Sequence, residues 1–385
     1  MSTFAIARLA MGLFVLLAAT SAGARIWHVE VDGSGDYSDI QPAVEAAAPG
    51  DTISIGPGRF ATFRTIEFPP WSVSTIVGVK KSGLRITGSG CDRTFLGPAG
   101  KTDAMSQVFY SDGGHDVAIE NMTIENTDLG INWANGHLLI RSCVFIGGDR
   151  GASIVVDKVE AIVRDCTFEQ PNSTGSIVVY HTKRHPDSCL IDNCTIRGGA
   201  TGVEVMPWAE DVVIRNTTIE DAQSGIVFQA ESKGRVENCA VVNSSFASAW
   251  VMSGATVDFA NTALTGGTRG LEIDGGIVTA RSLVISGTTA SALVVNLGGR
   301  ASIHGSDFLP ASGWAFYSEY YDEPVTAIDL TDNFWGTSDA ESIRASICDN
   351  RCYPPVACKV VFEPFAGGPV PTDVTSWGEV KVMFR

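Results

Sequence analysis

Residues 202–221 read GVEVMPWAEDVVIRNTTIED, and this stretch decides the fold. Three short runs of alternating residues, GVEV, VVIRN and TTIED, are separated by polar turns. Nearly the same phrase returns at 225–243 as GIVFQAESKGRVENCAVVN and at 270–287 as GLEIDGGIVTARSLVISG. Self-similarity at about 20–50 residues is typical of a solenoid, in which each repeat forms one coil.

One position of the repeat marks a tight turn, because only Asn, Asp, Ser or Gly occupies it. These residue types tolerate left-handed backbone angles or bond to their own backbone. Apolar residues two positions before the turn and three positions after it indicate a short strand on either side. The marked residues, at spacings of 21 to 28, are Asn121, Ser142, Asp165, Asn193, Asn216, Asn238, Asn261, Ser282, Gly305 and Asp332.

Each repeat therefore contains three short strands and three turns, which stack to share one apolar core. No amphipathic helix separates the strands, so a leucine-rich-repeat horseshoe or a Rossmann sheet is excluded. Crossovers between parallel strands are nearly always right-handed. The sequence predicts an all-β fold, a right-handed single-stranded parallel β-helix of about ten or eleven coils, with an N-terminal capping helix and a short C-terminal cap.

The segments that flank the repeats predict the domain boundaries. Arg8, the apolar run 9–20 and Ala22-Gly23-Ala24 form the pattern of a secretory signal peptide. The run is too short to span a bilayer, which needs about 20 residues. We expect a protein that is secreted, periplasmic or on the cell surface, and that has no membrane span. The predicted segments are a signal peptide 1–24, an N-terminal cap 25–60, a β-helix 61–335, a C-terminal cap 336–366 and a tail 367–385.

Each cap is predicted to contain one helix that begins with a capping box, a Ser followed three residues later by Gln or Glu. At the N-terminal end the pair is Ser38 and Gln41, with Pro49-Gly50 ending the helix. At the C-terminal end the pair is Ser338 and Glu341.

The net charge of −16 argues against polyanionic partners, which proteins bind through clustered Lys and Arg. Nucleic acid and anionic membranes are therefore not expected as partners. A polyanionic glycan would need calcium to bridge the like charges. No other cofactor is indicated.

The nine Cys fall into two sets and two unplaced residues, Cys91 and Cys189. Four of them directly follow the turn residue of the repeat, where we expect a stack of free, buried thiols. Three lie near the C-terminus, where one disulfide is expected with no preferred pairing. The first set is Cys143, Cys166, Cys194 and Cys239, and the second is Cys348, Cys352 and Cys358.

The coils, together with two other segments, resemble the right-handed parallel β-helix, or pectin-lyase-like, superfamily. Residues 32–60, DGSGDYSDIQPAVEAAAPGDTISIGPGRF, are similar to the N-terminal opening of pectin methylesterases. NFWGT at 333–337 resembles the ending of exported bacterial β-helix-repeat proteins. The resemblance covers about 30–365 and implies a fold rather than an activity, because the superfamily contains lyases, hydrolases, esterases, epimerases and non-enzymes.

The catalytic motifs of that superfamily do not match. NTDLGIN at 126–132 and GGDR at 147–150 are similar to two polygalacturonase motifs. Leu129 is inserted in the first motif, and Asn132 and Arg150 stand where carboxylates are expected. The GHG and RIK motifs are missing, so Asp128 and Asp149 are interpreted as turn residues.

In this superfamily a groove lies over the outward face of the strand typified by GVEV. Aromatic rings pack on sugar rings, and carboxylates bond hydroxyls or act as acid and base. A covering loop or the C-terminal tail would bury the same stripe instead. The residues predicted to bind substrate are Tyr180, His181, Glu204, Trp208, Gln229, Trp250, Glu272, Asp274 and Tyr317.

Two coils carry longer turns after this strand, YHTKRHPDS at 180–188 and SEYYDEP at 318–324. The first contains the densest group of titratable side chains, which suits a general base or a cation that neutralises a uronate. A solvated loop without chemistry is the alternative. The predicted catalytic residues are Lys183, Arg184, His185 and Asp187, and no metal ligands are predicted.

The sequence thus predicts an exported protein that interacts with a polysaccharide or a cell-surface glycan. One hypothesis is a polysaccharide lyase or glycoside hydrolase. The alternative is a non-catalytic structural or adhesion protein of the cell surface or matrix, which the missing motifs favour slightly.

Overall fold

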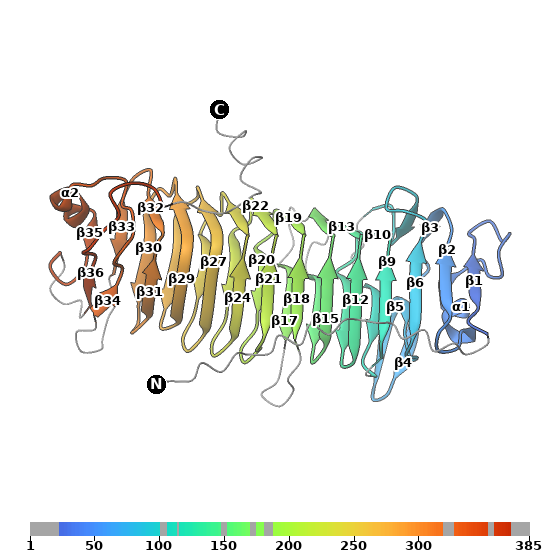
Figure 1. Ribbon diagram of the computed structural model, residues 1–385. Helices are drawn as coiled ribbons and strands as arrows, with labels where there is room; N and C mark the ends of the chain where they lie inside the picture. The colour runs from blue at the N-terminus through green and yellow to red at the C-terminus, as the bar shows by residue number, and fades with distance from the viewer. Residues whose placement is uncertain are drawn as a thin grey trace.

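The repeats fold into one elongated solenoid with a short helix at either end (Figure 1). The computed structural model describes residues 23–100, 106–113, 115–147, 152–169, 175–180, 188–318, 327–352 and 358–370. Two sheets run along the solenoid, one of 23 strands, here called sheet A, and one of 13, called sheet B. The predicted parallel β-helix is confirmed.

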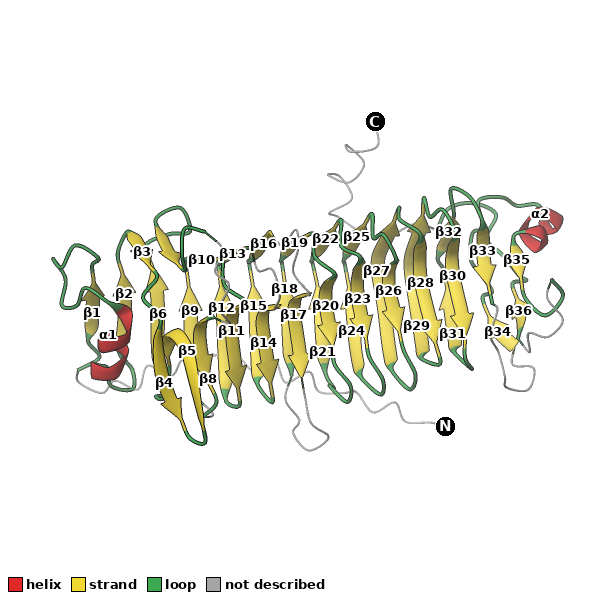
Figure 2. Ribbon diagram, turned by 180° about the vertical axis from the view of Figure 1, so that it is seen from behind, coloured by secondary structure: helices red, strands yellow, loops and turns green. Residues whose placement is uncertain are grey.

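Sheet B receives one strand from each coil, and its strands pair in parallel from β5 to β35. β4 is the exception, since it pairs with β5 as an antiparallel hairpin that extends beyond the neighbouring strands (Figure 2). The strands of sheet B are β4 (Arg64–Phe68), β5 (Trp71–Gly78), β8 (Gln107–Ser111), β11 (Leu129–Ala134), β14 (Ala152–Asp157), β17 (Gly175–Tyr180), β20 (Thr201–Val205), β23 (Ser224–Phe228), β26 (Ala247–Val251), β28 (Arg269–Asp274), β30 (Ser291–Asn296), β33 (Trp314–Tyr317) and β35 (Ile347–Cys348).

Sheet A receives two consecutive segments from most coils, which merge into one bent strand in β27 and β29. Its strands are β1 (Ile26–Val29), β2 (Thr52–Ile55), β3 (Gly58–Phe60), β6 (Leu84–Gly88), β7 (Thr94–Leu96), β9 (Val117–Glu120), β10 (Thr123–Glu125), β12 (His137–Arg141), β13 (Val144–Ile146), β15 (Glu160–Arg164), β16 (Thr167–Glu169), β18 (Cys189–Asp192), β19 (Thr195–Arg197), β21 (Val212–Arg215), β22 (Thr218–Glu220), β24 (Lys233–Glu237), β25 (Ala240–Val242), β27 (Thr256–Thr265), β29 (Ile277–Ser286), β31 (Arg300–His304), β32 (Asp307–Leu309), β34 (Ala327–Asp329) and β36 (Lys359–Val361).

The solenoid has about 12 turns, slightly more than the ten or eleven expected. The parallel ladder extends into both segments predicted as caps, since β1 pairs with β2 at one end and β34 with β36 at the other. The terminal coils lack the repeated turn phrase, so the sequence pattern does not reveal them.

The marked turn residues separate the two sheet A segments of their coils. Asn216, for example, lies between β21 and β22 with a φ of 50°. All ten marked residues have positive φ, as the residue types predict. Each coil therefore bends at the same place, which keeps the coils in register.

The core consists of the inward-facing Val, Ile, Leu and Phe residues of both sheets. Ile214 of β21 and Val205 of β20 are fully buried, as the alternation predicts. Phe145 and Phe168 of successive coils stack with ring centroids 4.8 Å apart. Equivalent side chains of successive coils thus stack along the solenoid. Each coil is too small to form a core alone, and stacking gives all the coils one shared core.

Helix α1 (Ile40–Ala46) covers the N-terminal end, but its predicted capping box is wrong. Asp39 is the N-cap, and its carboxylate accepts a hydrogen bond from the backbone N–H of Ile40. Gln41 is buried instead, and its amide accepts from the N–H of Gly78 at 2.8 Å and donates to the Gly78 carbonyl at 3.2 Å. Gln41 therefore satisfies backbone groups of Gly78, which lies beyond the part of β5 that pairs with β4.

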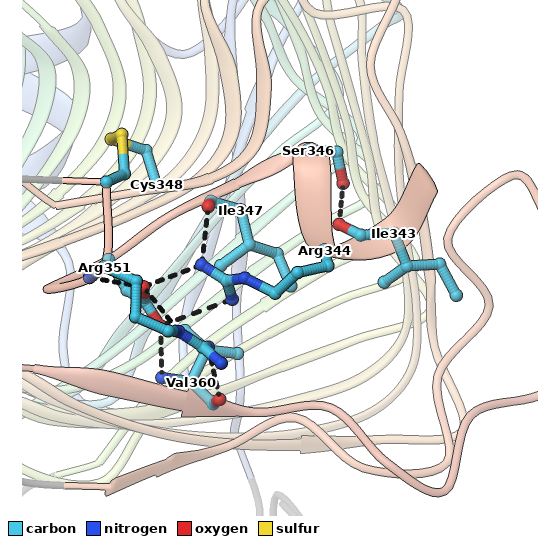
Figure 3. A network of polar contacts seen from close by, with 9 residues as sticks. Ile343, Arg344, Ser346, Ile347, Cys348, Arg351 and Val360 are labelled. Carbon is cyan, nitrogen blue, oxygen red and sulfur yellow. Dashed lines mark hydrogen bonds and ion pairs between the residues drawn. A yellow bond between two sulfur atoms is a disulfide. The ribbon is translucent and has the colours of Figure 1, made fainter. Parts of the chain in front are cut away.

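Helix α2 (Ala340–Ala345) lies at the C-terminal end, and Asp339 rather than Ser338 is its N-cap. Behind it, the fully buried carboxylate of Asp349 accepts hydrogen bonds from the guanidinium groups of Arg344 at 2.8 Å and Arg351 at 2.7 Å (Figure 3). The backbone N–H of Val360 donates to it at 3.0 Å. Together, these contacts tie helix α2, the segment after β35 and strand β36 into one cap.

The cysteines have the states that the repeat predicts. Cys143, Cys166, Cys194 and Cys239 are free and buried, and each Sγ lies 3.2–3.4 Å from the carbonyl oxygen two residues earlier. In the C-terminal set, Cys348 and Cys352 form the disulfide and Cys358 is free.

NFWGT at 333–337 closes the last complete turn. The buried Asn333 amide donates to the carbonyls of Ile303 at 2.6 Å and Leu330 at 2.9 Å, and its oxygen accepts from the N–H of Ser306 at 2.9 Å. The Trp335 ring packs 4.8 Å from Phe308. The motif is therefore structural.

Candidate functional site

The outward face of sheet B presents a straight row of side chains, one from each coil. The pairing of successive strands places these residues side by side, about 4.8 Å apart. The row is not open to solvent throughout, since Val178, Val227, Glu272 and Val294 are at most 7% exposed. The row contains Asn132, Val155, Val178, Glu204, Val227, Trp250, Glu272, Val294 and Tyr317.

A second row lies two residues further along each strand, at the strand ends. Tyr180 is next to Asp157 in this row, and Asp274 is next to Asn296. Tyr180 is 40% exposed. Burial, followed by the nearby carboxylates of Glu204 and Asp157, raises the pKa of its phenol.

Toward the C-terminal end of the face lies a cluster of five residues from neighbouring coils, which we call the Glu272 cluster: Phe246, Trp250, Arg269, Glu272 and Asp274. The Phe246 and Trp250 rings meet edge to face at 5.3 Å between centroids. The Trp250 indole N–H donates to the Asp274 carboxylate at 2.9 Å. Arg269 lies over the Phe246 ring at 5.2 Å and forms an ion pair with Glu272 at 2.5 Å.

Glu272 differs from the other acidic residues of the face by its burial, since only 3% of it is exposed. Burial raises the pKa of its carboxyl group, and the Asp274 charge adds to the rise, although Arg269 opposes it. Its Oε2 is buried and has no hydrogen-bond partner within the described ranges. A carboxyl with a raised pKa next to a second carboxylate is a pattern found where acid and base roles are separated.

The remaining predicted binding residues lie around this cluster. The Gln229 amide donates to the Glu204 carboxylate, and these residues lie two and three coils before Glu272. Trp208 lies in the turn after β20, 44% exposed, and its indole N–H donates to Glu231 at 3.1 Å. Tyr317 lies in the row beside Val294 and Cys348, two coils beyond Glu272.

The structure thus brings together Trp250, Glu272 and Asp274, and it spreads the others along the face. Sequence reasoning missed Phe246 and Arg269, which precede the predicted strand runs and so do not appear in the alternation. The predicted catalytic residues Lys183, Arg184, His185 and Asp187, together with His181, lie outside the described residues. Their roles stay predictions.

The charge of the described part of this face is mainly negative. Asp157, Glu204, Glu272 and Asp274 contribute four carboxylates, and Arg269 is the cation among them. Within the described ranges, no three His, Cys, Asp or Glu side chains converge to hold a metal ion. No helix found there is long and apolar enough to cross a membrane.

The tail was one candidate for a cover over this face. Its described part runs elsewhere, since the Ala366 N–H donates to the Asn333 carbonyl at 2.9 Å and the Val370 N–H to Asp307 at 3.0 Å. Asp307 belongs to β32 of sheet A. Residues 362–370 therefore leave the Glu272 cluster uncovered.

Comparisons with known proteins identify the fold. Residues 107–264 match the family model described as a right handed beta helix region. The catalytic unit of a GH87 α-1,3-glucanase from Streptomyces thermodiastaticus superposes with a TM-score of 0.52 at 13% identity, covering 78% of this chain and 69% of the glucanase chain. A mannuronic acid specific polysaccharide family 6 lyase from human gut microbiota superposes with a TM-score of 0.54 at 11% identity, covering 94% of both chains. No curated protein matches the sequence. At these identities the likeness shows the fold alone.

Proposed function

Because the chain is a right-handed parallel β-helix of the pectin-lyase-like type, we propose that it is a carbohydrate-active protein that binds a polysaccharide along the outward face of sheet B and hydrolyses it at the Glu272 cluster. The observation that carries the proposal is the buried carboxyl of Glu272, with its raised pKa, beside the carboxylate of Asp274 and the ring of Trp250. Both structural neighbours described above act on polysaccharides by name, which is in keeping with this class of ligand.

Binding is assigned to the rows of sheet B because their shape and chemistry suit a sugar chain. The coils repeat about every 4.8 Å, so two coils correspond roughly to the length of two sugar residues in an extended chain. Trp250 and Phe246 offer ring surface for pyranose faces, and Glu204, Gln229 and Asn296 offer polar groups for hydroxyls. The face therefore supports several subsites in line with the solenoid axis.

Hydrolysis is assigned to two carboxyl groups with different environments. Glu272, whose pKa is raised, donates its proton to the glycosidic oxygen as the bond to the anomeric carbon breaks. The Asp274 carboxylate, oriented by the Trp250 indole N–H, accepts a proton from the water that attacks this carbon. The products are two shorter chains, and water supplies the hydroxyl and the proton that they gain.

The charge of the face favours a neutral glycan. A uronate chain would bring its carboxylates close to those of Glu204, Glu272 and Asp274, and like charges in a partly desolvated groove are costly. A lyase would also need a cation to neutralise the uronate, and Arg269 is already paired with Glu272. The predicted basic loop 181–187 beside Tyr180 remains a separate proposal for an anionic sugar.

A non-catalytic glycan-binding role is the second candidate, and a specific observation favours it. Both carboxylates of the pair already have partners, Arg269 for Glu272 and Trp250 for Asp274. Such contacts also serve to rigidify a binding face. Export to the periplasm, medium or cell surface, proposed from the signal-peptide pattern, suits either role.

The test compares purified wild type with Glu272→Gln on a panel of neutral and uronic-acid polysaccharides, with binding and new reducing ends measured separately. We expect a neutral glycan to be bound and cleaved by the wild type, and Glu272→Gln to bind it while cleaving at least about 100-fold more slowly. Wild-type activity should fall as pH rises through the raised pKa of Glu272, because the acid must be protonated.

Glu220→Gln on sheet A is the matched control, since it removes one carboxylate that pairs with Arg197 far from the cluster. It should leave cleavage unchanged. Binding without cleavage by the wild type would support the non-catalytic role. Equal activity of wild type and Glu272→Gln would reject the assignment of the acid.

A further inference from the structure

The outward face of sheet A carries a ladder of mostly charged side chains, with one residue from each coil. The strand register places them in a single row, independent of the face discussed above. The row runs through Glu120, Arg141, Arg164, Asp192, Arg215, Glu237, Ala260, Arg281 and His304.

Charges within the first part of this ladder neutralise one another. Glu120 pairs with Arg141 at 2.9 Å. Asp192 lies between two arginines, 2.8 Å from Arg164 and 2.9 Å from Arg215. Burial alone would raise the pKa of Asp192, but the hydrogen bonds from Arg215, Asn216 and Arg164 lower it to about 2. Up to β21 the ladder thus consists of two ion-paired groups, Glu120 with Arg141, and Asp192 with Arg164 and Arg215.

The ladder is interrupted at Ala260 of β27. Its methyl group is too short to reach either neighbour in the row, Glu237 of β24 or Arg281 of β29, which lie two coils apart, about 10 Å. Arg281 forms no ion pair with any residue that the structure describes, and Glu237 lies 3.7 Å from Arg235. The row therefore lacks a charged side chain at Ala260, between Glu237 and Arg281.

The gap is a real hollow in the surface, with a volume of about 250 Å³. It lies over four strands, β24, β27, β29 and β31, which are adjacent in Figure 1. Sites for drug-sized ligands are about 300–1,000 Å³, so this hollow suits something smaller, such as one sugar residue. Its lining is of both signs, since Arg235 lies beside the carboxylates of Glu237 and Asp258 at one side, and Arg281 and His304 lie at the other.

We propose that this hollow is a binding site for a hexuronate, a single sugar residue that carries a carboxylate. The carboxylate of the ligand replaces the missing anionic partner of Arg281, as a charge-assisted hydrogen bond. Its hydroxyl groups donate to Glu237 and to Asp258, which otherwise accepts from the Thr279 hydroxyl. The ligand thereby completes the ladder between β24 and β29.

Both halves of the ligand are needed by this arrangement. A carboxylate alone would meet Arg281 but leave Glu237 and Asp258 close to its own charge. A neutral sugar would bond the two carboxylates but leave Arg281 without an anion. The hollow should therefore distinguish glucuronate from both acetate and glucose, and the proposal does not depend on the Glu272 cluster.

Isothermal titration and NMR shift mapping of the whole protein with sodium D-glucuronate test the proposal. We expect a Kd on the order of 1 mM, as suits a ligand of this size, and much weaker responses to glucose and acetate. Arg281→Gln should weaken glucuronate binding about tenfold. Ala260→Gln should abolish it, because the new side chain fills the hollow and bonds Glu237 and Arg281 itself.

The controls separate this site from charge effects and from the function proposed above. Arg300→Gln removes an equal charge at the start of β31, outside the hollow, and should leave glucuronate binding unchanged. Glu272→Gln should also leave it unchanged. A thermal midpoint of Ala260→Gln at or above that of the wild type would show that its fold is intact.

An oligosaccharide of hexuronates adds a further arm. Tighter binding of the oligosaccharide would assign the hollow to a residue within a chain, and equal affinity would assign it to the free sugar acid. The proposal is overturned if glucuronate does not bind, if glucose binds equally well, or if Ala260→Gln binds glucuronate as the wild type does.

Discussion

Asn238 shows at the scale of one residue how a coil is closed. It lies between β24 and β25 with a φ of 53°, and its exposed side chain reaches Asn216 of the previous coil at 3.4 Å. A left-handed backbone costs an ordinary L-residue about 1–2 kcal/mol, and Asn and Gly tolerate it best. The residue type is therefore selected by the backbone angle more than by the side-chain contact.

Asn238→Val should lower the free energy of unfolding by about 1–2 kcal/mol, because a β-branched residue opposes the left-handed angle. Asn238→Gly keeps the angle accessible and should remain close to the wild type. Urea unfolding curves of the three proteins measure the difference. Equal losses in both variants would show that the Asn side chain matters here rather than the backbone angle.

The same reasoning explains which single residues could be predicted from the sequence. Every marked turn residue was predictable, because the left-handed angle restricts the residue type at each coil. The N-caps were placed one residue too early, since Ser and Asp are adjacent in both caps and either can accept the capping bond. The burial of Glu272 could not be predicted, because it depends on Phe246 and Arg269, which lie outside the alternating run.

Among the elements, the C-terminal cap depends on one buried carboxylate. Asp349 has no exposed surface and holds Arg344, Arg351 and the N–H of Val360. Burial alone would raise the pKa of Asp349, but these hydrogen bonds and the charge of Arg344 lower it to about 2. Because the folded state lowers this pKa, the ionised carboxylate stabilises the fold at pH values above the ordinary pKa of 3.8. This stabilisation is lost as pH falls from 3.8 toward 2.

Asp349→Asn should therefore be less stable than the wild type at neutral pH, and the difference should shrink by about 2 kcal/mol as pH falls from about 4 to 2. Denaturant titrations at several pH values measure this. Glu341→Gln, which changes an exposed carboxyl on α2, should show no such trend. A pH-independent difference between Asp349→Asn and wild type would contradict the role of the charge.

The stack of thiols is a second element whose state can be measured. Burial raises the pKa of Cys189 and of Cys239 to about 12, and it raises that of Cys166 strongly. Thiols that are buried and protonated react slowly with alkylating agents. In the folded protein, we expect labelling only at the half-buried Cys91, and labelling of all seven free thiols after denaturation. Mass spectrometry that found a bridge between Cys143 and Cys166, or rapid labelling of the stack, would contradict this.

The whole molecule is an elongated solenoid, which Figures 1 and 2 show from opposite sides. Its two sheets carry different rows of side chains. Sheet B carries the aromatic and acidic Glu272 cluster, and sheet A carries the ion-pair ladder. The fold was predictable from the sequence because the same pattern of turn and apolar residues recurs in every coil. The site was predictable only in part, because it arises once, where particular residues of adjacent coils meet.

The central claim is that sheet B binds a polysaccharide at the Glu272 cluster. The most direct test is the affinity of Trp250→Ala for the glycan that the wild type binds, measured by affinity electrophoresis or calorimetry. Trp71→Ala is the matched control, since Trp71 is 66% exposed on the β4–β5 hairpin, away from the cluster. We predict that Trp250→Ala loses about tenfold or more in affinity while Trp71→Ala binds as the wild type does. Unchanged affinity in Trp250→Ala, or an equal loss in both variants, would contradict the account.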